Sequence, residues 1–139
     1  MNITVKKGNL VDTKTQAAVL CMCEGEKEFS QLIVKIDQKT GGLIRDVVNK
    51  GDFEGKPSQV CVIYTKGNLP AKRIALVGLG KKNELDLEKV RGAFARVMQH
   101  LRGLNIRDAA TAMDWSLLPD QKENFAAAVA EGVKLGLYQ

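Results

Sequence analysis

The first segment of this chain that could bind a ligand is a glycine turn. Residues Arg73–Lys82 read RIALVGLGKK, in which an apolar run ends at Gly78-Leu79-Gly80 and two lysines follow. A phosphate-binding loop has this form when a helix opens directly after it, because the N–H groups of the first helical turn then meet the phosphate. The segment therefore has to be tested as a nucleotide site.

Three features of the following residues argue against a nucleotide at this turn. The dinucleotide fingerprint G-x-G-x-x-G needs a third glycine, and Asn83 stands in its place. The next helix begins only after Asp86, whose carboxylate can cap the N–H groups that a phosphate would need. No acidic residue suited to a ribose ends the next predicted strand, since Asp108 begins it. We expect Gly78 and Gly80 to supply backbone angles closed to other residues where a strand ends.

The three cysteines and the single histidine are the next candidates, because thiolate and imidazole bind zinc. Cys21 and Cys23 lie one residue apart in the apolar run AAVLCMC, whereas zinc knuckles place C-x₂₋₄-C on turns. In a strand both thiols would share one face and Met22 the other. Cys61 and His100 do not complete a metal-ligand pattern with them. We therefore predict that the cysteines act as small buried hydrophobes.

A carboxylate cluster near Gly51 is the last candidate. Asp46, Asp52 and Glu54 fall close together in the sequence, but no histidine or further ligand accompanies them. We predict turn and helix-end residues here. Because the chain also lacks the G-x-S-x-G and H-E-x-x-H patterns, we predict no catalytic, cofactor-binding or metal-binding residue in it.

Alternating strands and helices must position these residues. The predicted strands are Ile3–Lys7, Ala17–Met22, Val60–Lys66, Arg73–Leu79 and Asp108–Met113. The second and fourth are nearly continuous apolar runs, the pattern of strands that are covered on both faces. Strand pairs without an intervening helix can be antiparallel, so the order predicts an α/β fold with a mixed sheet flanked by helices on both faces, a three-layer α/β/α arrangement.

The predicted helices follow apolar residues at helical spacing. They cover Glu28–Asp37, a short segment from Leu43 toward Gly51 after the break at Thr40-Gly41-Gly42, a segment from the N-cap Asp86 to Leu101, and the residues after Pro119-Asp120. The last helix contains Gly132-x-x-x-Gly136 among alanines. We expect these glycines to seat it closely on the sheet.

Length and composition favour one cytoplasmic domain over residues 1–139. The chain is 45% hydrophobic and 27% charged, enough for a core without disulfide or metal staples. The start, MNITVKKGNL, lacks the apolar stretch of a secretory signal, and no run is long enough to span a membrane. We therefore expect no membrane partner.

The net charge of +5 raises the question of nucleic acid as a partner. Lys89, Arg91, Arg96 and Arg102 recur along one predicted helix and could contact phosphates. Elsewhere the lysines are scattered, and no segment interleaves basic with aromatic residues as single-strand binders do. A solvated basic surface and a nucleic-acid-binding module, with DNA as partner, both remain open.

Several segments together resemble the N-terminal domain of the leucyl aminopeptidase (cytosol aminopeptidase) family. They are RIALVGLGKK, KVRGAFARV, AAVAEGVKLGLY and the turn KGDFEGK with the preceding LIVKIDQKTGGLI. The most specific are V-G-L-G-K at Val77–Lys81 and E-G-x-x-L-G-x-Y at Glu131–Tyr138. The resemblance covers essentially all 139 residues.

The resemblance implies a non-catalytic accessory domain. In the family, the catalytic and metal-binding motifs lie in a C-terminal domain, and none of them occurs here. The parent would be a homohexamer that removes N-terminal residues from peptides with two divalent metal ions, zinc or manganese, and some bacterial members bind DNA. This domain would contact its own C-terminal catalytic domain and act in assembly or active-site access.

The resemblance also implies a macro-domain-like fold and so raises ADP-ribose or nucleotide binding as an alternative. Macro domains that bind ADP-ribose carry an asparagine-rich strand end and a glycine-rich loop. The matching strand, Ala18–Cys23, has no asparagine, and the loop is reduced to Thr40-Gly41-Gly42-Leu43. Both departures argue against ligand binding.

Overall fold

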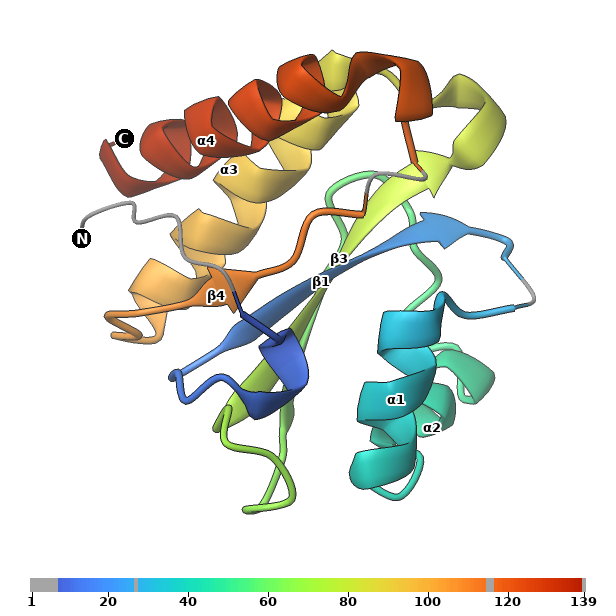
Figure 1. Ribbon diagram of the computed structural model, residues 1–139, viewed down its shortest axis with the longest axis vertical. Helices are drawn as coiled ribbons and strands as arrows, with labels where there is room; N and C mark the ends of the chain where they lie inside the picture. The colour runs from blue at the N-terminus through green and yellow to red at the C-terminus, as the bar shows by residue number, and fades with distance from the viewer. Residues whose placement is uncertain (1–7, 27, 115–116, 139) are drawn as a thin grey trace.

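The computed structural model describes residues 8–26, 28–114 and 117–138, and Figure 1 shows their arrangement. The strands are β1 (Ala18–Glu24), β2 (Val60–Tyr64), β3 (Arg73–Lys81) and β4 (Ala110–Thr111). The helices are α1 (Gln31–Lys39), α2 (Leu43–Asn49), α3 (Leu87–Gly103) and α4 (Lys122–Tyr138), with short 3₁₀ turns η1 (Leu10–Asp12), η2 (Lys82–Glu84) and η3 (Pro119–Gln121). The predicted strand Ile3–Lys7 lies outside the described residues.

The described strands form one mixed sheet in the order β2-β3-β1-β4. β1 runs parallel to β3 and β4, because helices carry the chain back between them, whereas β2 turns directly into β3 and is antiparallel to it. The mixed α/β sheet predicted from the element order is therefore confirmed.

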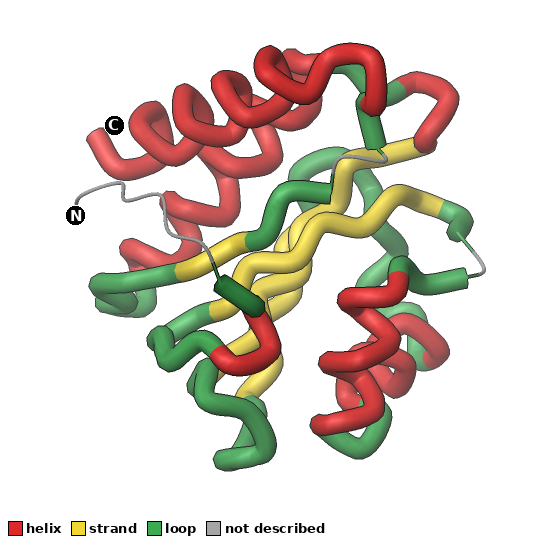
Figure 2. The backbone as a smooth tube through the Cα atoms, in the orientation of Figure 1, coloured by secondary structure: helices red, strands yellow, loops and turns green. Residues whose placement is uncertain are grey.

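Helices cover both faces of this sheet (Figures 1 and 2). One core lies between the sheet and α3 with α4, where Val19 and Val77 point. The other lies between the sheet and α1 with α2, where Leu20 and Leu76 point. Both central strands are buried on both faces, as their continuous apolar sequences indicate. This confirms the three-layer arrangement.

The predicted strand Asp108–Met113 is much shorter in the structure. Only Ala110 and Thr111 pair with β1. The hydroxyl of Thr111 donates to the backbone carbonyl of Val19 at 2.9 Å, and the ladder ends there. The Thr111 side chain thus occupies a carbonyl of β1 that could otherwise have accepted a backbone N–H group and extended the pairing.

The glycines of α4 do not face the sheet, and that prediction was wrong. They lie against α3, which runs alongside α4 in the same direction: a Cβ on Gly132 would lie 2.9 Å from Cβ of Phe94, and one on Gly136 would lie 2.7 Å from Cβ of Met98. Each would come still closer to a backbone carbonyl oxygen of α3. The two glycines therefore let the helix backbones approach each other.

The helix ends show how local sequence fixes this arrangement. Asp86 caps α3 as predicted, accepting from the backbone N–H of Lys89 at 2.9 Å. The N-cap residue before α2 is Gly42, which has no side chain to cap the helix. The buried carboxylate of Asp37, on α1, accepts from the N–H groups of Ile44 at 2.9 Å and Arg45 at 3.1 Å. One side chain of α1 thus holds the start of α2.

Replacing Asp37 with alanine is expected to lower the free energy of unfolding by about 2 kcal/mol, because two helix N–H groups lose their acceptor in a buried place. Asp46→Ala is the control, since that carboxylate is exposed and pairs with exposed Lys50 at 3.0 Å. The control should cost less than about 1 kcal/mol. Urea unfolding followed by circular dichroism measures both, and equal losses would contradict the capping role.

Candidate functional site

The glycine segment is not a turn but the end of strand β3. The N–H of Gly78 donates to the carbonyl of Gln59 at 2.8 Å, and the N–H of Gly80 donates to the carbonyl of Gly55 at 2.9 Å. Gly78 accepts in turn from the N–H of Ser58 at 2.9 Å. The backbone groups that a phosphate would need are thus bonded to residues 55–59.

The two glycines serve different purposes. Gly80 has φ 78°, so the prediction of a backbone angle closed to other residues is confirmed there. Gly78 has no such angle, and for this residue the prediction was wrong. A Cβ on Gly78 would lie 2.5 Å from the carbonyl carbon of Gly55 and closer still to the carbonyl oxygen of Lys56. Gly78 is required because another backbone passes directly over it.

Gln59 is the residue of this contact that the sequence reasoning missed. Its side-chain oxygen accepts from the N–H groups of Glu54, Gly55 and Lys56 at 2.9, 3.0 and 3.3 Å. It thereby shapes the loop that covers Gly78. No signal in the sequence places residues 55–59 on the end of β3, because the contact joins two segments separated along the chain.

Cys21 and Cys23 share one face of the sheet and Met22 lies on the other, as predicted. Cys21 and Cys23 contact the core under α3 and α4, whereas Met22 lies in the opposite core. Cys61 packs on the Met22 side, away from the other two. Among residues 8–26, 28–114 and 117–138, no group of three histidine, cysteine, aspartate or glutamate side chains could hold a metal ion. The divalent ions implied by the family do not fit these residues.

The thiols are also poor ligands and nucleophiles. Burial, with the charges of Cys23 and Asp114 adding to it, raises the pKa of Cys21 to about 12. Burial raises the pKa of Cys23 to about 11. Both groups therefore stay protonated at neutral pH, whereas metal binding and nucleophilic attack need the thiolate.

These thiols predict a loss of stability in alkali. The unfolded chain releases their protons near the ordinary thiol pKa of 9.0, whereas the folded chain keeps them, so the folded state binds more protons above that pH. Stability should be unaffected below about pH 9 and fall as the pH rises, by up to about 1.4 kcal/mol per pH unit for each thiol. Urea midpoints between pH 8 and about 11 measure this slope. Cys21→Ala/Cys23→Ala should flatten it, whereas Val19→Ala should lower stability without changing it.

The carboxylates near Gly51 lie apart in exposed positions. Asp46 pairs with Lys50 at 3.0 Å, and Glu54 pairs with Lys56 at 2.9 Å. The N–H of Asp52 donates to the carbonyl of Val47 at the end of α2. The prediction of turn and helix-end residues is confirmed.

The loop that would match a macro-domain phosphate loop is a helix break. Gly41 and Gly42 adopt φ 72° and 88°, and the N–H of Gly42 donates to the carbonyl of Asp37 at 2.8 Å. The carboxylate of Asp37 occupies the N–H groups that follow, at Ile44 and Arg45. The N–H groups of Gly42, Ile44 and Arg45 are therefore bonded within the chain.

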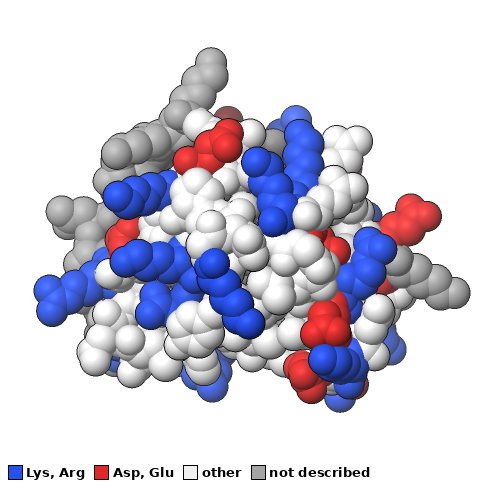
Figure 3. Space-filling model, turned by 90° about the horizontal axis from the view of Figure 1, so that it is seen from below, with Lys and Arg blue, Asp and Glu red and all other residues white. Residues whose placement is uncertain are grey.

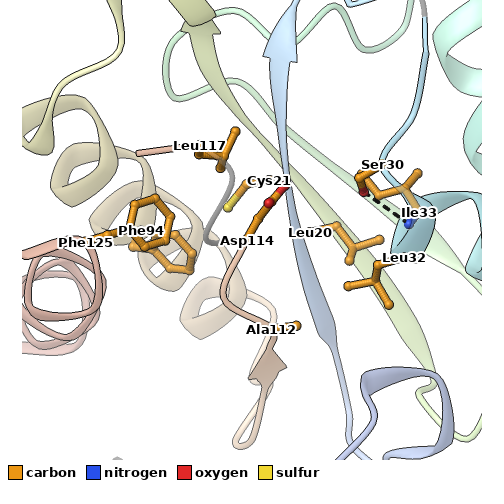
Figure 4. Close-up of a pocket in the computed structure, with 10 residues that line it drawn as sticks. All are labelled: Leu20, Cys21, Ser30, Leu32, Ile33, Phe94, Ala112, Asp114, Leu117 and Phe125. Carbon is orange, nitrogen blue, oxygen red and sulfur yellow. Dashed lines mark hydrogen bonds between the residues drawn. The ribbon is translucent and has the colours of Figure 1, made fainter. Parts of the chain in front are cut away.

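A small cavity lies beside β1 where β4 has ended (Figure 4). Its lining comes from β1, α1, α3, α4 and the segments next to β4 and α4: Leu20, Cys21, Ser30, Leu32, Ile33, Phe94, Ala112, Asp114, Leu117 and Phe125. Its volume is about 20 Å³, room for roughly one water molecule and far too little for ADP-ribose.

The basic residues of α3 are largely bonded to the rest of the chain. Arg91 pairs with Glu131 of α4 at 2.8 Å and with Glu88, and Lys89 donates to the carbonyl of Glu84 at 2.9 Å. The guanidinium of Arg102 donates to the carbonyl of Leu137. α3 therefore does not present the continuous basic row that its sequence suggested.

Comparison with known proteins decides the family. The family model for the N-terminal domain of the cytosol aminopeptidase family matches residues 18–139, most of the chain. The chain belongs to the cytosol aminopeptidase family. It is 35% identical over its whole length to a probable cytosol aminopeptidase of Roseiflexus castenholzii, of which it covers 26%. It is 34% identical over 99% of its length to the cytosol aminopeptidase of Pseudomonas aeruginosa, of which it covers 28%. The chain thus spans about a quarter of these relatives.

Solved structures share the fold of this cytosol aminopeptidase domain. A mutant of tomato leucine aminopeptidase superposes with a TM-score of 0.77 at 23% identity, over 96% of this chain and 27% of that one. The macrodomain of Mycobacterium tuberculosis DarG superposes with a TM-score of 0.70 at 15% identity, over 94% and 89%. The macro-domain-like fold is therefore confirmed. Within the described part of the chain, no helix has both the length and the apolar character needed to cross a bilayer.

Proposed function

We propose that residues 1–139 form the single, non-catalytic N-terminal domain of a metal-dependent aminopeptidase that removes N-terminal residues from peptides in the cytoplasm. The main support is the match to the family's N-terminal domain over residues 18–139, in a chain that covers only 26% of the Roseiflexus relative. The two metal ions, zinc or manganese, and the peptide substrate would be bound outside this chain. Its partner would be the catalytic domain, in a homohexamer.

The described residues support a non-catalytic role through what their polar groups do. The N–H groups of Gly78 and Gly80, the carboxylate of Asp37 and the amide of Gln59 all bond within the domain. The thiols of the central strand are protonated at neutral pH because their pKa values are raised. These polar groups build the fold, and the domain would act by placing or shielding the catalytic domain.

A peptidase assay tests whether the domain is non-catalytic. We expect the purified chain to show no turnover of a leucyl amide with manganese or zinc, because no ligand set is present among the described residues. Turnover that persists after repurification, and that is lost with a chelator, would overturn it.

A domain exchange tests whether the domain acts as an accessory to the catalytic domain. This chain would replace the 139 aligned residues at the matching part of the Pseudomonas aeruginosa enzyme, with an unrelated α/β domain of similar length as control. We expect the exchanged protein to assemble like the parent and to keep kcat/KM within about tenfold, a loss below about 1.4 kcal/mol. If the assembly and kcat/KM of the exchanged protein were the same as those of the control, the accessory role would be contradicted.

A further inference from the structure

Strand β2 forms one edge of the sheet and pairs with β3 alone among the described strands. Two hydrogen bonds show which of its backbone groups face β3. The N–H of Thr65 donates to the carbonyl of Lys72 at 3.1 Å, and the carbonyl of Gln59 accepts at 2.8 Å from β3. Because these groups alternate between the two sides of a strand, odd-numbered residues face β3 and even-numbered ones face away. The outward N–H and C=O groups are those of Val60, Val62 and Tyr64.

The outward edge of β2 lacks the features that keep an open strand edge from pairing. Natural sheets place lysine, proline or a bulge there. The segment Val60–Tyr64 reads VCVIY, without charge, proline or glycine, and its register with β3 is continuous. Charged side chains are common elsewhere on the molecule, as the view from below shows (Figure 3). The edge of β2 therefore offers an unprotected template for another strand.

Both faces of this edge are apolar. Val60 and Val62 are half-buried against the core under α3, and Cys61 packs on the opposite core under α1 and α2. Tyr64 ends the strand and is 60% exposed, with the guanidinium of Arg73 at 5.3 Å from the centre of its ring. A strand added at this edge would have to be apolar on both of its own faces. β2 itself meets that requirement.

We propose that two copies of this domain pair through β2, antiparallel about a twofold axis at Val62, so that their two sheets become continuous. In this register Val62 lies opposite its counterpart, and Val60 lies opposite Tyr64 of the second copy. All the outward groups are then bonded, in about six hydrogen bonds, and an aromatic ring packs on a β-branched side chain. A register shifted by two residues leaves some of these groups unpaired. The second copy therefore satisfies both the backbone and the side chains of the edge.

Solvent exchange of single backbone amides, measured by NMR on the full chain, tests this pairing. The amide of Val62 is open in one copy and bonded in the pair, whereas that of Ile63 faces β3 in both. If the dissociation constant is about 100 μM, which suits so small an interface, the outward amides should exchange about fourfold more slowly at roughly 1 mM than at about 20 μM protein. The amides of Cys61 and Ile63 should not change. Equal slowing along the whole of β2, or no slowing at Val62, would overturn the proposal.

Two variants that add one lysine each test where the copies meet. Val62→Lys places two ammonium groups opposite each other on the twofold axis and should weaken pairing about tenfold or more. Asn68→Lys adds the same charge to the exposed loop after β2 and should change the dissociation constant less than about twofold. Sedimentation equilibrium measures both constants, and circular dichroism verifies that both variants fold. Equal weakening by the two variants would overturn the proposal.

A charge pair tests the register and the identity of the partner. Tyr64→Glu removes the aromatic contact and places a carboxylate opposite Val60 of the second copy, which should weaken pairing about fivefold. Val60→Lys/Tyr64→Glu should restore it to within about twofold, because each lysine then lies opposite a glutamate of the other copy. A foreign peptide as the occupant predicts no such rescue, so failed rescue in a folded double variant would overturn the proposal. The pairing goes beyond the accessory role proposed above, whose peptidase assay involves none of these residues, so either proposal can fail alone.

Discussion

Replacing Gly78 with alanine is expected to lower the free energy of unfolding by about 3 to 5 kcal/mol, among the largest effects of a single substitution. The added methyl group would lie 2.5 Å from the carbonyl carbon of Gly55, and backbone atoms cannot rotate away as a side chain can. Residues 55–59 would have to lift off β3 and release hydrogen bonds at Ser58 and Gln59. Urea unfolding followed by circular dichroism gives the loss directly.

Gly67→Ala is the matched control for this prediction. Gly67 has φ 84° but open space around its Cβ position, so its substitution adds backbone strain without a collision. That strain costs about 1 to 2 kcal/mol. A loss for Gly78→Ala no greater than for Gly67→Ala would show that the segment over Gly78 moves aside easily, and the close approach would then have little energetic weight.

The double substitution Gly132→Ala/Gly136→Ala is expected to lower the free energy of unfolding by about 4 kcal/mol, although alanine is the better helix former. Helix propensity favours alanine by about 1 kcal/mol at each position. Each new methyl group, however, meets backbone carbonyls of α3 and the Cβ of Phe94 or Met98. Helix α4 must then move outward and expose part of the core beneath it, which costs more than the propensity gains.

Gly92→Ala is the control that measures the gain in helix propensity alone, without a collision. Gly92 lies on the exposed side of α3 with no atom near its Cβ position. Its substitution should therefore raise the free energy of unfolding by about 0.5 to 1 kcal/mol. If the double variant on α4 were also more stable than the natural chain, the close packing of α3 and α4 would not limit the helix positions.

The elements buried on both faces were the ones most clearly predicted from sequence. β1 and β3 are near-continuous apolar runs, and Asp86 marks the start of α3 through a capping bond that depends on neighbouring residues alone. Local patterns sufficed because local chemistry decides these features. The strand predicted at Asp108–Met113 is shorter because its length depends on Thr111 bonding to β1, a contact distant in sequence.

The errors at glycines have one physical origin. A glycine can be required for its backbone angle, as at Gly80, or for a close neighbour, as at Gly78, and the sequence alone does not distinguish the two. Gly80 adopts a positive φ, whereas Gly78 lies directly beneath the backbone of another segment. Gly132 and Gly136 also have a close neighbour, but it is helix α3 and not the sheet.

The position of β1 at the centre of the sheet sets the order in which the chain can fold. Ala18 pairs with Ile74 on one side and with Ala110 on the other, so both partners are synthesised long after it. During translation, a strand that is apolar on both faces must therefore wait without a partner, a state prone to aggregation. The hairpin of β2 and β3 is the one pairing in the described sheet that forms between neighbouring segments. We expect it to fold first and to serve as the template on which β1 later assembles.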